Sequence, residues 1–363
     1  MNNVREIRRY GQSIWLDLLD RNLMDSGTLK KLIEEDGLRG LTSNPAIFEK
    51  AISNSSDYDG DIAEFSKKGM DNEDIFFEIA VADIQRAADI FKPVYDETNG
   101  GDGFVSLEVS PHLARDTGGT MEQARELWKK VNRKNVMIKI PGTLEGLPAI
   151  HQCTSEGINV NVTLLFGLDR YRKVAEAYMD GLEERVNAGQ PIDEVCSVAS
   201  FFLSRIDVMV DPLLEEKGLH NLKGETAIAS AKKAYTIYEE VFSSERFKKL
   251  KSKGARAQRV LWASTSTKDP SYSDVKYVEA LIGEDTINTL PMETLNAFRD
   301  HGKATDSLKN DMDKASKTLE KIEESGIQMK QIAHHLVEEG IEKFNTPFKK
   351  LLSGIEEQKN VSV

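Results

Sequence analysis

Eight short apolar or alternating runs recur along the chain, and longer segments with helical spacing separate them. Strands that alternate with helices in this way are typical of an α/β protein, and eight of them indicate a (β/α)8 TIM barrel. In the segment after residue 167, apolar side chains recur every three or four residues, as in an amphipathic helix: Leu168, Tyr171, Ala175, Tyr178 and Leu182. The expected strands are 13–20, 37–44, 104–110, 135–141, 158–166, 197–204, 259–266 and 286–291.

An open, doubly wound sheet is the alternative arrangement for such a pattern. Its usual sign is a Gly-rich phosphate loop after the first strand, which this chain lacks. The segment "GGDG" at 100–103 precedes a strand instead, so we expect it to form a turn. The barrel is therefore the favoured fold.

Two stretches exceed what a minimal barrel requires. In residues 206–256 the helical spacing of apolar residues is long enough for more than one helix, and the segment 301–355 is rich in Lys and Glu. The second stretch has only about two heptad-like turns, which favours a helix packed on the barrel over a coiled coil. Its spaced apolar residues are Leu308, Met312, Ala315, Leu319 and Ile322. We expect one domain over residues 1–363, with 301–363 as a helical extension.

Several of the expected strands have one apolar face and one polar face. Successive side chains in a strand point to opposite faces, and in a barrel the outer face must meet the helices. The apolar set then belongs outside and the polar set inside, where buried polar groups are costly unless they have partners or a function. The inward polar set comprises Asp17, Asn44, Glu108, Lys139, Asn161, Thr163 and Ser200.

Composition narrows the classes of function. Of the 363 residues, 39% are hydrophobic and 30% are charged, which suits a soluble globular protein. The first residues have no apolar signal region, and no run approaches the length of a membrane span, so we expect a cytoplasmic protein. The net charge of −12 argues against nucleic-acid binding but permits a small anionic ligand. Cys153 and Cys196 are expected to be buried thiols, and the scattered histidines predict no metal site.

Lys139 interrupts "NVMIKIP", which otherwise has the pattern of a buried strand. A lone strand lysine is also typical of an exposed sheet edge, but a closed barrel has no edge. Among Ile, Met and neutral polar groups, burial favours the neutral amine, which can attack a carbonyl to form a Schiff base. Two carboxylates on neighbouring strands would transfer protons. These parts suffice to cleave or form a carbon–carbon bond without a metal.

Six segments carry a resemblance to the transaldolase family over about residues 10–300. They are "LDLLD", "LTSNPAIF", "VSLEVSP", "VMIKIPGTLEGLPAI", "INVNVTLLF" and "SFFLSRID", in the family's order and spacing. The resemblance implies a barrel of the class I aldolase type, in the long bacterial or plastid-like form, that transfers a dihydroxyacetone unit in the non-oxidative pentose phosphate pathway. The donor would be sedoheptulose 7-phosphate or fructose 6-phosphate, and the acceptor glyceraldehyde 3-phosphate or erythrose 4-phosphate. No cofactor, nucleic acid, membrane or obligate protein partner is implied.

The resemblance also implies a role for each matching residue. Lys139 would be the Schiff-base nucleophile, Asp17 would move the proton of the donor hydroxyl, and Glu108 would act through a water held by Thr163. The dihydroxyacetone unit would be bound by Asn44, Asn161 and Ser200, and the phosphate by Arg205, Ser264 and Lys268. Well-known members carry an arginine where this chain has Lys268, and a lysine lacks the bidentate fork of arginine. A solvated loop lysine is the alternative at that position.

Other functions are compatible with parts of the pattern. Fructose 6-phosphate aldolases share the barrel and the lysine, but they are shorter, lack a glutamate at position 108 and have tyrosine where this chain has Phe202. A fused sugar-phosphate isomerase would need more than 363 residues. An inactive sugar-phosphate sensor would not need a reactive lysine. A scaffold that acts through its C-terminal helices remains a third possibility.

Overall fold

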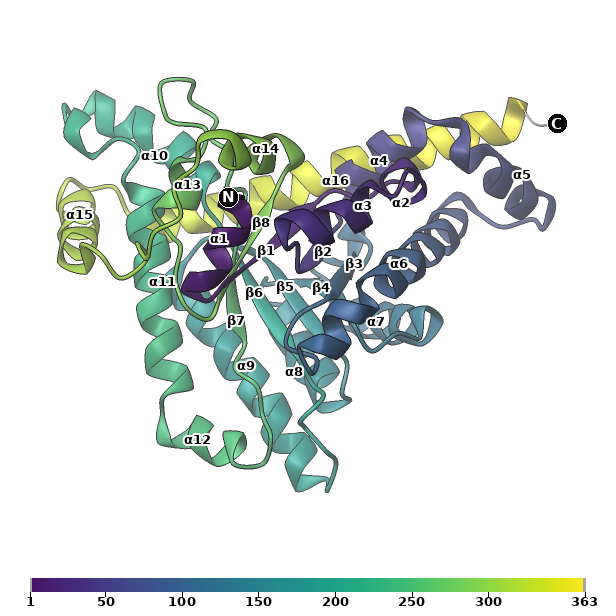
Figure 1. Ribbon diagram of the computed structural model, residues 1–363, viewed down its shortest axis with the longest axis horizontal. Coiled ribbons are helices and arrows are strands. Elements are labelled where there is room, and N and C mark those ends of the chain that lie inside the picture. The colour runs from purple at the N-terminus through teal and green to yellow at the C-terminus, as the bar shows by residue number, and fades with distance from the viewer. Residues whose placement is uncertain (1, 362–363) are drawn as a thin grey trace.

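The chain folds into a closed barrel of eight parallel strands in sequence order, as the computed structural model shows for residues 2–361 (Figure 1). The barrel closes where β1 pairs with β8, so no strand edge is left open. This confirms the predicted (β/α)8 fold. The strands are β1 (Gln12–Asp17), β2 (Gly40–Thr42), β3 (Phe104–Glu108), β4 (Val136–Pro141), β5 (Val160–Leu165), β6 (Ser197–Phe202), β7 (Arg259–Ala263) and β8 (Thr286–Leu290).

Helices cover the barrel and extend beyond it. The two long stretches are helical, which confirms those parts of the pattern. The helices are α1 (Asn3–Ile7), α2 (Arg21–Asp25), α3 (Thr28–Lys31), α4 (Pro45–Ser53), α5 (Asp59–Lys67), α6 (Asn72–Glu97), α7 (Thr117–Val131), α8 (Gly146–Ser155), α9 (Leu168–Asn187), α10 (Ser204–Glu216), α11 (Thr226–Phe242), α12 (Glu245–Lys251), α13 (Lys276–Glu279), α14 (Met292–His301), α15 (Met312–Glu324) and α16 (Met329–Val361). Shorter helical turns are Arg8–Tyr10, Leu32–Asp36, Ser56–Tyr58, Pro111–Leu113 and His220–Leu222.

The expected strands were mostly too long at their C-terminal ends, and at two of these ends the polar residue caps the next helix. Asp20 accepts a hydrogen bond from the backbone N–H of Leu23 at 2.6 Å and begins α2. Asn44 accepts one from Ile47 at 3.1 Å and begins α4. A side-chain oxygen at such a position satisfies a free N–H of the first helical turn. The last residue of each of these two expected strands therefore begins a helix instead.

Leu308 corrects the expected helix of the C-terminal stretch. It is fully buried but precedes α15, and Asp311 before that helix has a φ of +55°. The backbone N–H of Leu308 instead donates to the carbonyl of Ile282 at 2.9 Å. A Cβ added to Gly283 would lie 2.6 Å from the Cβ of Leu308. Leu308 therefore fills a place beside the loop before β8 and is not part of the helical stripe.

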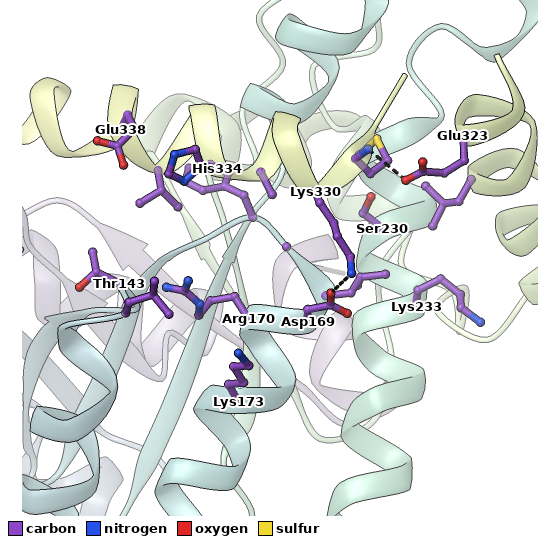
Figure 2. Close-up of a pocket in the computed structure, with 18 of the residues that line it drawn as sticks. Thr143, Asp169, Arg170, Lys173, Ser230, Lys233, Glu323, Lys330, His334 and Glu338 are labelled. Carbon is purple, nitrogen blue, oxygen red and sulfur yellow. Dashed lines mark hydrogen bonds and ion pairs between the residues drawn. The ribbon is translucent and has the colours of Figure 1, made fainter. Parts of the chain in front are cut away.

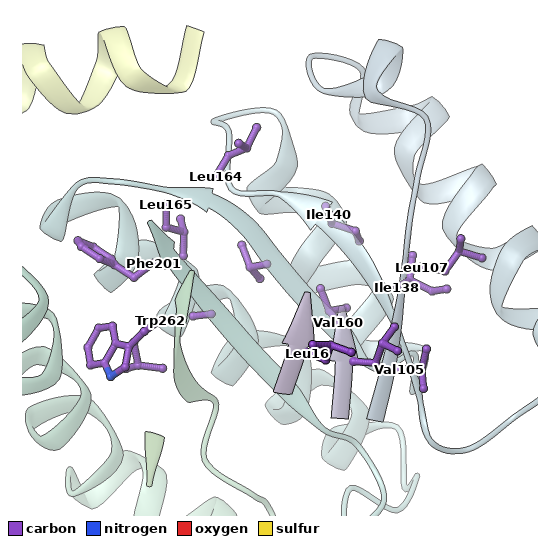
Figure 3. Close-up of a cluster of buried hydrophobic side chains, with 14 of the residues drawn as sticks. Leu16, Val105, Leu107, Ile138, Ile140, Val160, Leu164, Leu165, Phe201 and Trp262 are labelled. Atoms are coloured by element: carbon purple, nitrogen blue, oxygen red, sulfur yellow. The ribbon is translucent and has the colours of Figure 1, made fainter. Parts of the chain in front are cut away.

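Buried apolar side chains form two separate clusters on either side of the strands. The larger cluster fills the space between strands and helices, and Figure 3 shows part of it around Leu16, Ile138, Val160 and Trp262. The smaller one lies inside the barrel and consists of Trp15, Phe104, Met137, Cys196, Val198, Leu261, Ala263 and Ile287. On β1, β3, β4 and β6 the next inward positions are polar, namely Asp17, Ser106, Lys139 and Ser200, as the alternation predicted, whereas on β7 Leu261 is followed by the apolar Ala263.

Helix α16 crosses the barrel at the end where the strands terminate (Figure 1). It contacts α4, α5, α6 and α10, as well as β5. Cys153 and Cys196 are buried free thiols, as expected. Within residues 2–361, no helix is long and apolar enough to cross a membrane. No three His, Cys, Asp or Glu side chains of the described residues are grouped so that they could hold a metal ion.

Candidate active site

Lys139 lies on β4 with its amine inside the barrel. Its Nζ donates to Oε2 of Glu108 at 3.0 Å and to the carbonyl oxygen of Ser43 at 2.9 Å. Lys139 and Glu108 are paired in register on β4 and β3, and they are only 5% and 6% exposed. A buried charge is tolerated when it is paired and hydrogen-bonded. The lysine therefore has a charged partner in a nearly dry site.

The surroundings of Lys139 differ from the expected shell of Ile, Met and neutral groups. Ile138 and Ile140 pack in the outer cluster, and Met137 belongs to the inner cluster. The direct neighbour of the amine is the carboxylate of Glu108. Strand alternation sends Ile138 and Ile140 outward and leaves the polar residues of β3 beside the lysine. The sequence predicted the face correctly but not this ion pair.

Two carboxyl groups inside the barrel have raised pKa values. For Glu108 the cause is burial, which is partly offset by the charge and hydrogen bond of Lys139. Asp17, at the end of β1, is partly buried and accepts a hydrogen bond from Oγ1 of Thr42 at 2.6 Å. Burial raises the pKa of Asp17, while the Thr42 bond and the charge of Lys139 lower it. Both carboxyls therefore hold a proton more readily than free side chains do.

Asn161 on β5 links two serines across the barrel interior. Its Nδ2 donates to Oγ of Ser106 at 3.0 Å, and its Oδ1 accepts from Oγ of Ser200 at 2.7 Å. All three side chains are buried, and Asn161 is paired in register with Lys139. The amide is thereby held in one orientation beside the lysine.

Thr163 lies two residues after Asn161 on β5 and therefore on the same face of the strand. Its hydroxyl is buried and has no hydrogen-bond partner among residues 2–361. Such a group is costly unless a ligand or an ordered water satisfies it. The next residue, Leu164, has a φ of +58°, and the β5–β6 register is irregular between Val162 and Leu165. Backbone strain of this kind is concentrated at functional sites in proteins. The unpaired hydroxyl faces the same interior as Lys139.

Asn44 lies at the rim of this cluster. Its Oδ1 is used to cap α4, and it lines a small cavity together with Glu108 and Phe348. Its Nδ2 forms no hydrogen bond within residues 2–361, so this group can donate to a ligand. The structure thus places Asn44 near Glu108, with the Oδ1 of Asn44 engaged in capping α4 and its Nδ2 available.

The residues expected to bind phosphate lie at the end of β7 and the start of α10. The hydroxyls of Ser204 and Ser264 are 2.9 Å apart, and Ser264 has a φ of +54°. The side chain of Lys268 is exposed, and its Nζ donates to Oγ of Ser266 at 2.7 Å. Partial desolvation of the amine by its surroundings lowers its pKa, and the charge of Arg205 lowers it further. Arg205 forms no hydrogen bond or ion pair within residues 2–361, and burial lowers the pKa of its guanidinium. Two mutually repelling cations at one place favour an anion between them.

Comparison with known proteins is consistent with this geometry. Residues 14–355 match the family model described as Transaldolase/Fructose-6-phosphate aldolase. The chain belongs to this family. A transaldolase of Trichodesmium erythraeum is 47% identical over 370 residues, which cover 98% of this chain and 97% of that protein. A transaldolase of Thiobacillus denitrificans is 44% identical over 358 residues, which cover 98% of this chain and all of that protein.

Some polar groups of this member of the transaldolase/fructose-6-phosphate aldolase family were not singled out from sequence. Thr42 and Ser106 each lie two residues before a predicted site residue, Asn44 and Glu108, and so on the same strand face. The alternation of polar and apolar residues could therefore have predicted them as well. The carbonyl of Ser43 gives no such signal, because every residue has one. Phe344 on α16 lies with its ring centroid 5.8 Å from Nζ of Lys139. It arrives from a helix far along the chain, and nothing in its local pattern indicated this.

A large cavity of about 800 Å³ lies away from the barrel interior of this transaldolase-family chain, between α9, α11, α15 and α16 (Figure 2). Arg170 and Lys173 project from α9 on one side, and Lys330 of α16 forms an ion pair with Asp169 at 2.8 Å. None of the described residues that line it belongs to the expected site. This cavity is therefore separate from the buried Lys139–Glu108 pair and from the other residues of the expected site.

Proposed function

We propose that this protein is a transaldolase that transfers a dihydroxyacetone unit through a Schiff base on Lys139. The donor is sedoheptulose 7-phosphate or fructose 6-phosphate, and the acceptor is glyceraldehyde 3-phosphate or erythrose 4-phosphate. The observation that carries the proposal is the buried amine of Lys139, 3.0 Å from Glu108 inside the barrel. The names of the relatives described above support the same reaction.

The first steps join the donor to the lysine. Nζ of Lys139 attacks the ketone carbon, and the resulting carbinolamine loses water to give an iminium. Glu108 exchanges the protons of these steps, and its raised pKa suits an acid that must also act as a base near neutral pH. The unpaired hydroxyl of Thr163 is suited to hold the water that carries them.

The carbon–carbon bond breaks when Asp17 takes the proton of the adjacent donor hydroxyl. The raised pKa of Asp17 makes its carboxylate a stronger base than a free aspartate. The aldose phosphate leaves, and the electron pair remains on the three-carbon unit as an enamine on Lys139. The acceptor aldehyde then forms the new bond, and Asp17 returns the proton to its oxygen.

The remaining site residues bind rather than react. Asn161 and Ser200 are already linked by a hydrogen bond of 2.7 Å and, with Nδ2 of Asn44, contact the hydroxyls of the dihydroxyacetone unit. Arg205, Ser264 and Lys268 receive the phosphate beside the first turn of α10, whose free N–H groups favour an anion.

Fructose 6-phosphate aldolase is the second candidate, because the family name covers both reactions. The resemblance associates that activity with tyrosine at the position of Phe202 and with no glutamate at position 108. Phe202 here packs against Phe166, with ring centroids 5.3 Å apart, and offers no hydroxyl to a bound intermediate. Both positions therefore favour transfer over release.

We also propose the setting in which the reaction occurs. The chain acts as one barrel unit over residues 1–363, with 301–363 as its extension, and it works in the cytoplasm. Its partners are sugar-phosphate substrates, without nucleic acid, membrane or an obligate protein partner, and without a cofactor.

A product assay tests the function. Purified protein is incubated with fructose 6-phosphate, with and without erythrose 4-phosphate, and the products are separated by chromatography. A transaldolase forms sedoheptulose 7-phosphate and glyceraldehyde 3-phosphate only when the acceptor is present. Steady release of dihydroxyacetone without the acceptor would instead identify an aldolase, and no turnover in either mixture would refute both activities.

A further inference from the structure

Phe344 is the aromatic side chain of α16 that lies above the reactive amine. Its ring centroid is 5.8 Å from Nζ of Lys139, and the residue is half-buried. Because Lys139 itself is almost fully buried, the ring closes the site on the side of the barrel that α16 crosses. An aromatic ring there excludes water without competing for hydrogen bonds with the substrate.

The position of Phe344 is fixed by contacts one turn to either side. Gly340 packs on β5 so closely that an added Cβ would lie 2.9 Å from Cδ2 of Leu164. Phe348 is buried, and its ring is 5.4 Å from Phe76 and 5.3 Å from His112. Residues spaced by four lie on one face of a helix. The contacts of Gly340 and Phe348 on this face therefore hold the ring of Phe344 over the opening of the barrel above Lys139.

Exclusion of water by the ring of Phe344 affects one stage of the proposed reaction. After the aldose phosphate leaves, the three-carbon enamine stays on Lys139 until an acceptor arrives. If its nucleophilic carbon takes a proton, the iminium that forms can add water at the former ketone carbon. Cleavage of the carbon–nitrogen bond then releases dihydroxyacetone and free Lys139, and the transfer is lost. Water at the amine is thus the competitor of the acceptor.

We infer that Phe344 is a specificity-determining residue that keeps water from the intermediate on Lys139 and so favours transfer over release. This inference rests on the proposed transaldolase function. The ring volume, rather than any polar group, provides the effect, so leucine at this position should largely preserve it and alanine should not.

The test compares F344A and F344L with F242A, which removes a half-buried phenylalanine of α11 outside the expected site. Each protein receives fructose 6-phosphate and erythrose 4-phosphate, and free dihydroxyacetone and sedoheptulose 7-phosphate are quantified in the same sample. Their ratio does not depend on how much of the protein is folded. We expect the release-to-transfer ratio to rise at least about tenfold in F344A, and to stay within about twofold of wild type in F344L and F242A.

An unchanged ratio in F344A, in protein that still transfers, would overturn the inference and leave the proposed function intact. An equal rise in F344L and F344A would also overturn it, because ring volume would not then be the cause. Absence of transfer in the wild-type protein would instead refute the proposed function itself.

Discussion

The amine of Lys139 and the carboxylate of Glu108 lie 3.0 Å apart, on adjacent strands of a closed barrel. In water such a pair contributes little, but here both groups are buried and each is the partner that the other needs. The strand pattern predicted both residues inside the barrel, and the proposed Schiff-base chemistry uses both.

Replacement of Glu108 by glutamine should slow formation of the Schiff base. The variant keeps the shape of the side chain but removes the group that exchanges protons with the amine, so kcat should fall by about 10²- to 10⁴-fold. Single-turnover trapping with fructose 6-phosphate measures the step directly. The matched control is Glu194→Gln, which removes an exposed partner of Lys134 and should leave the rate unchanged. A trapping rate in Glu108→Gln within threefold of wild type would contradict the assigned role.

Asp17 should make the folded protein less stable as the pH rises above its ordinary pKa of 3.8. Because burial raises this pKa in the folded state, the native protein binds the proton more tightly than the unfolded chain. The stabilising effect is complete below the unfolded pKa and is lost as the pH rises through the folded pKa. In Asp17→Asn this loss is absent.

Urea unfolding of both proteins at pH 4 and pH 7 measures this difference. The free energy of unfolding of Asp17→Asn minus that of wild type should be larger at pH 7 than at pH 4, because only wild type loses stability over this interval. A relative stability that changes in the opposite direction with pH would show that the pKa of Asp17 is lowered by folding. Activity of the variant should be lost at both pH values, because amide cannot accept the hydroxyl proton.

Arg205 should contribute to binding of the phosphate group rather than to the bond-breaking step. A hydrogen bond to a charged group contributes about 1.5–3 kcal/mol, so Arg205→Ala should raise KM for fructose 6-phosphate by about tenfold to a hundredfold. Lys268→Ala should have a smaller effect, because Lys268 is exposed and binds as a single point charge. Steady-state kinetics with free dihydroxyacetone as a poor donor and unphosphorylated glyceraldehyde as acceptor provides the control, since neither substrate then carries a phosphate and neither variant should alter the rate. Equal losses with both donors would place Arg205 elsewhere in the mechanism.

Gly40 should be required for closure of the barrel interior. A Cβ at this position would lie 2.5 Å from the ring of Trp15, which is fully buried in the inner cluster. Overpacking of this kind costs about 1–3 kcal/mol, so Gly40→Ala should lower the free energy of unfolding by that amount. Gly60→Ala in α5 is the matched control, because an added Cβ there has no neighbour within 4 Å. Equal stability of both variants would indicate that Trp15 moves aside without cost.

The sequence predicted the fold and the inward face because both follow from local alternation. The apolar residues next to them in each strand predicted an inward position for five polar side chains, and all five lie inside the barrel: Asp17, Glu108, Lys139, Asn161 and Ser200. Strand ends were less accurate, since an asparagine or aspartate at the end of a strand pattern can equally cap the next helix. The direct Lys139–Glu108 contact depends on the register between two strands, which no local pattern specifies.

Contacts made by the C-terminal stretch were hardest to predict. Leu308 continued a helical spacing, yet it fills a separate site against the loop before β8. Phe344 belongs to an ordinary amphipathic pattern, and only the path of α16 over the barrel brings its ring above Lys139. Tertiary packing determines both contacts, and the periodicity of the sequence contains no information about it.

The most direct test of the account is reduction with borohydride in the presence of fructose 6-phosphate, followed by mass mapping of peptides. Lys232 is an internal control, because it is also buried but donates to backbone carbonyls outside the expected site. We expect a three-carbon adduct on Lys139 and none on Lys232, and we expect the adduct to be lost in Lys139→Met. Folded protein that forms no adduct on Lys139 would contradict the Schiff-base mechanism.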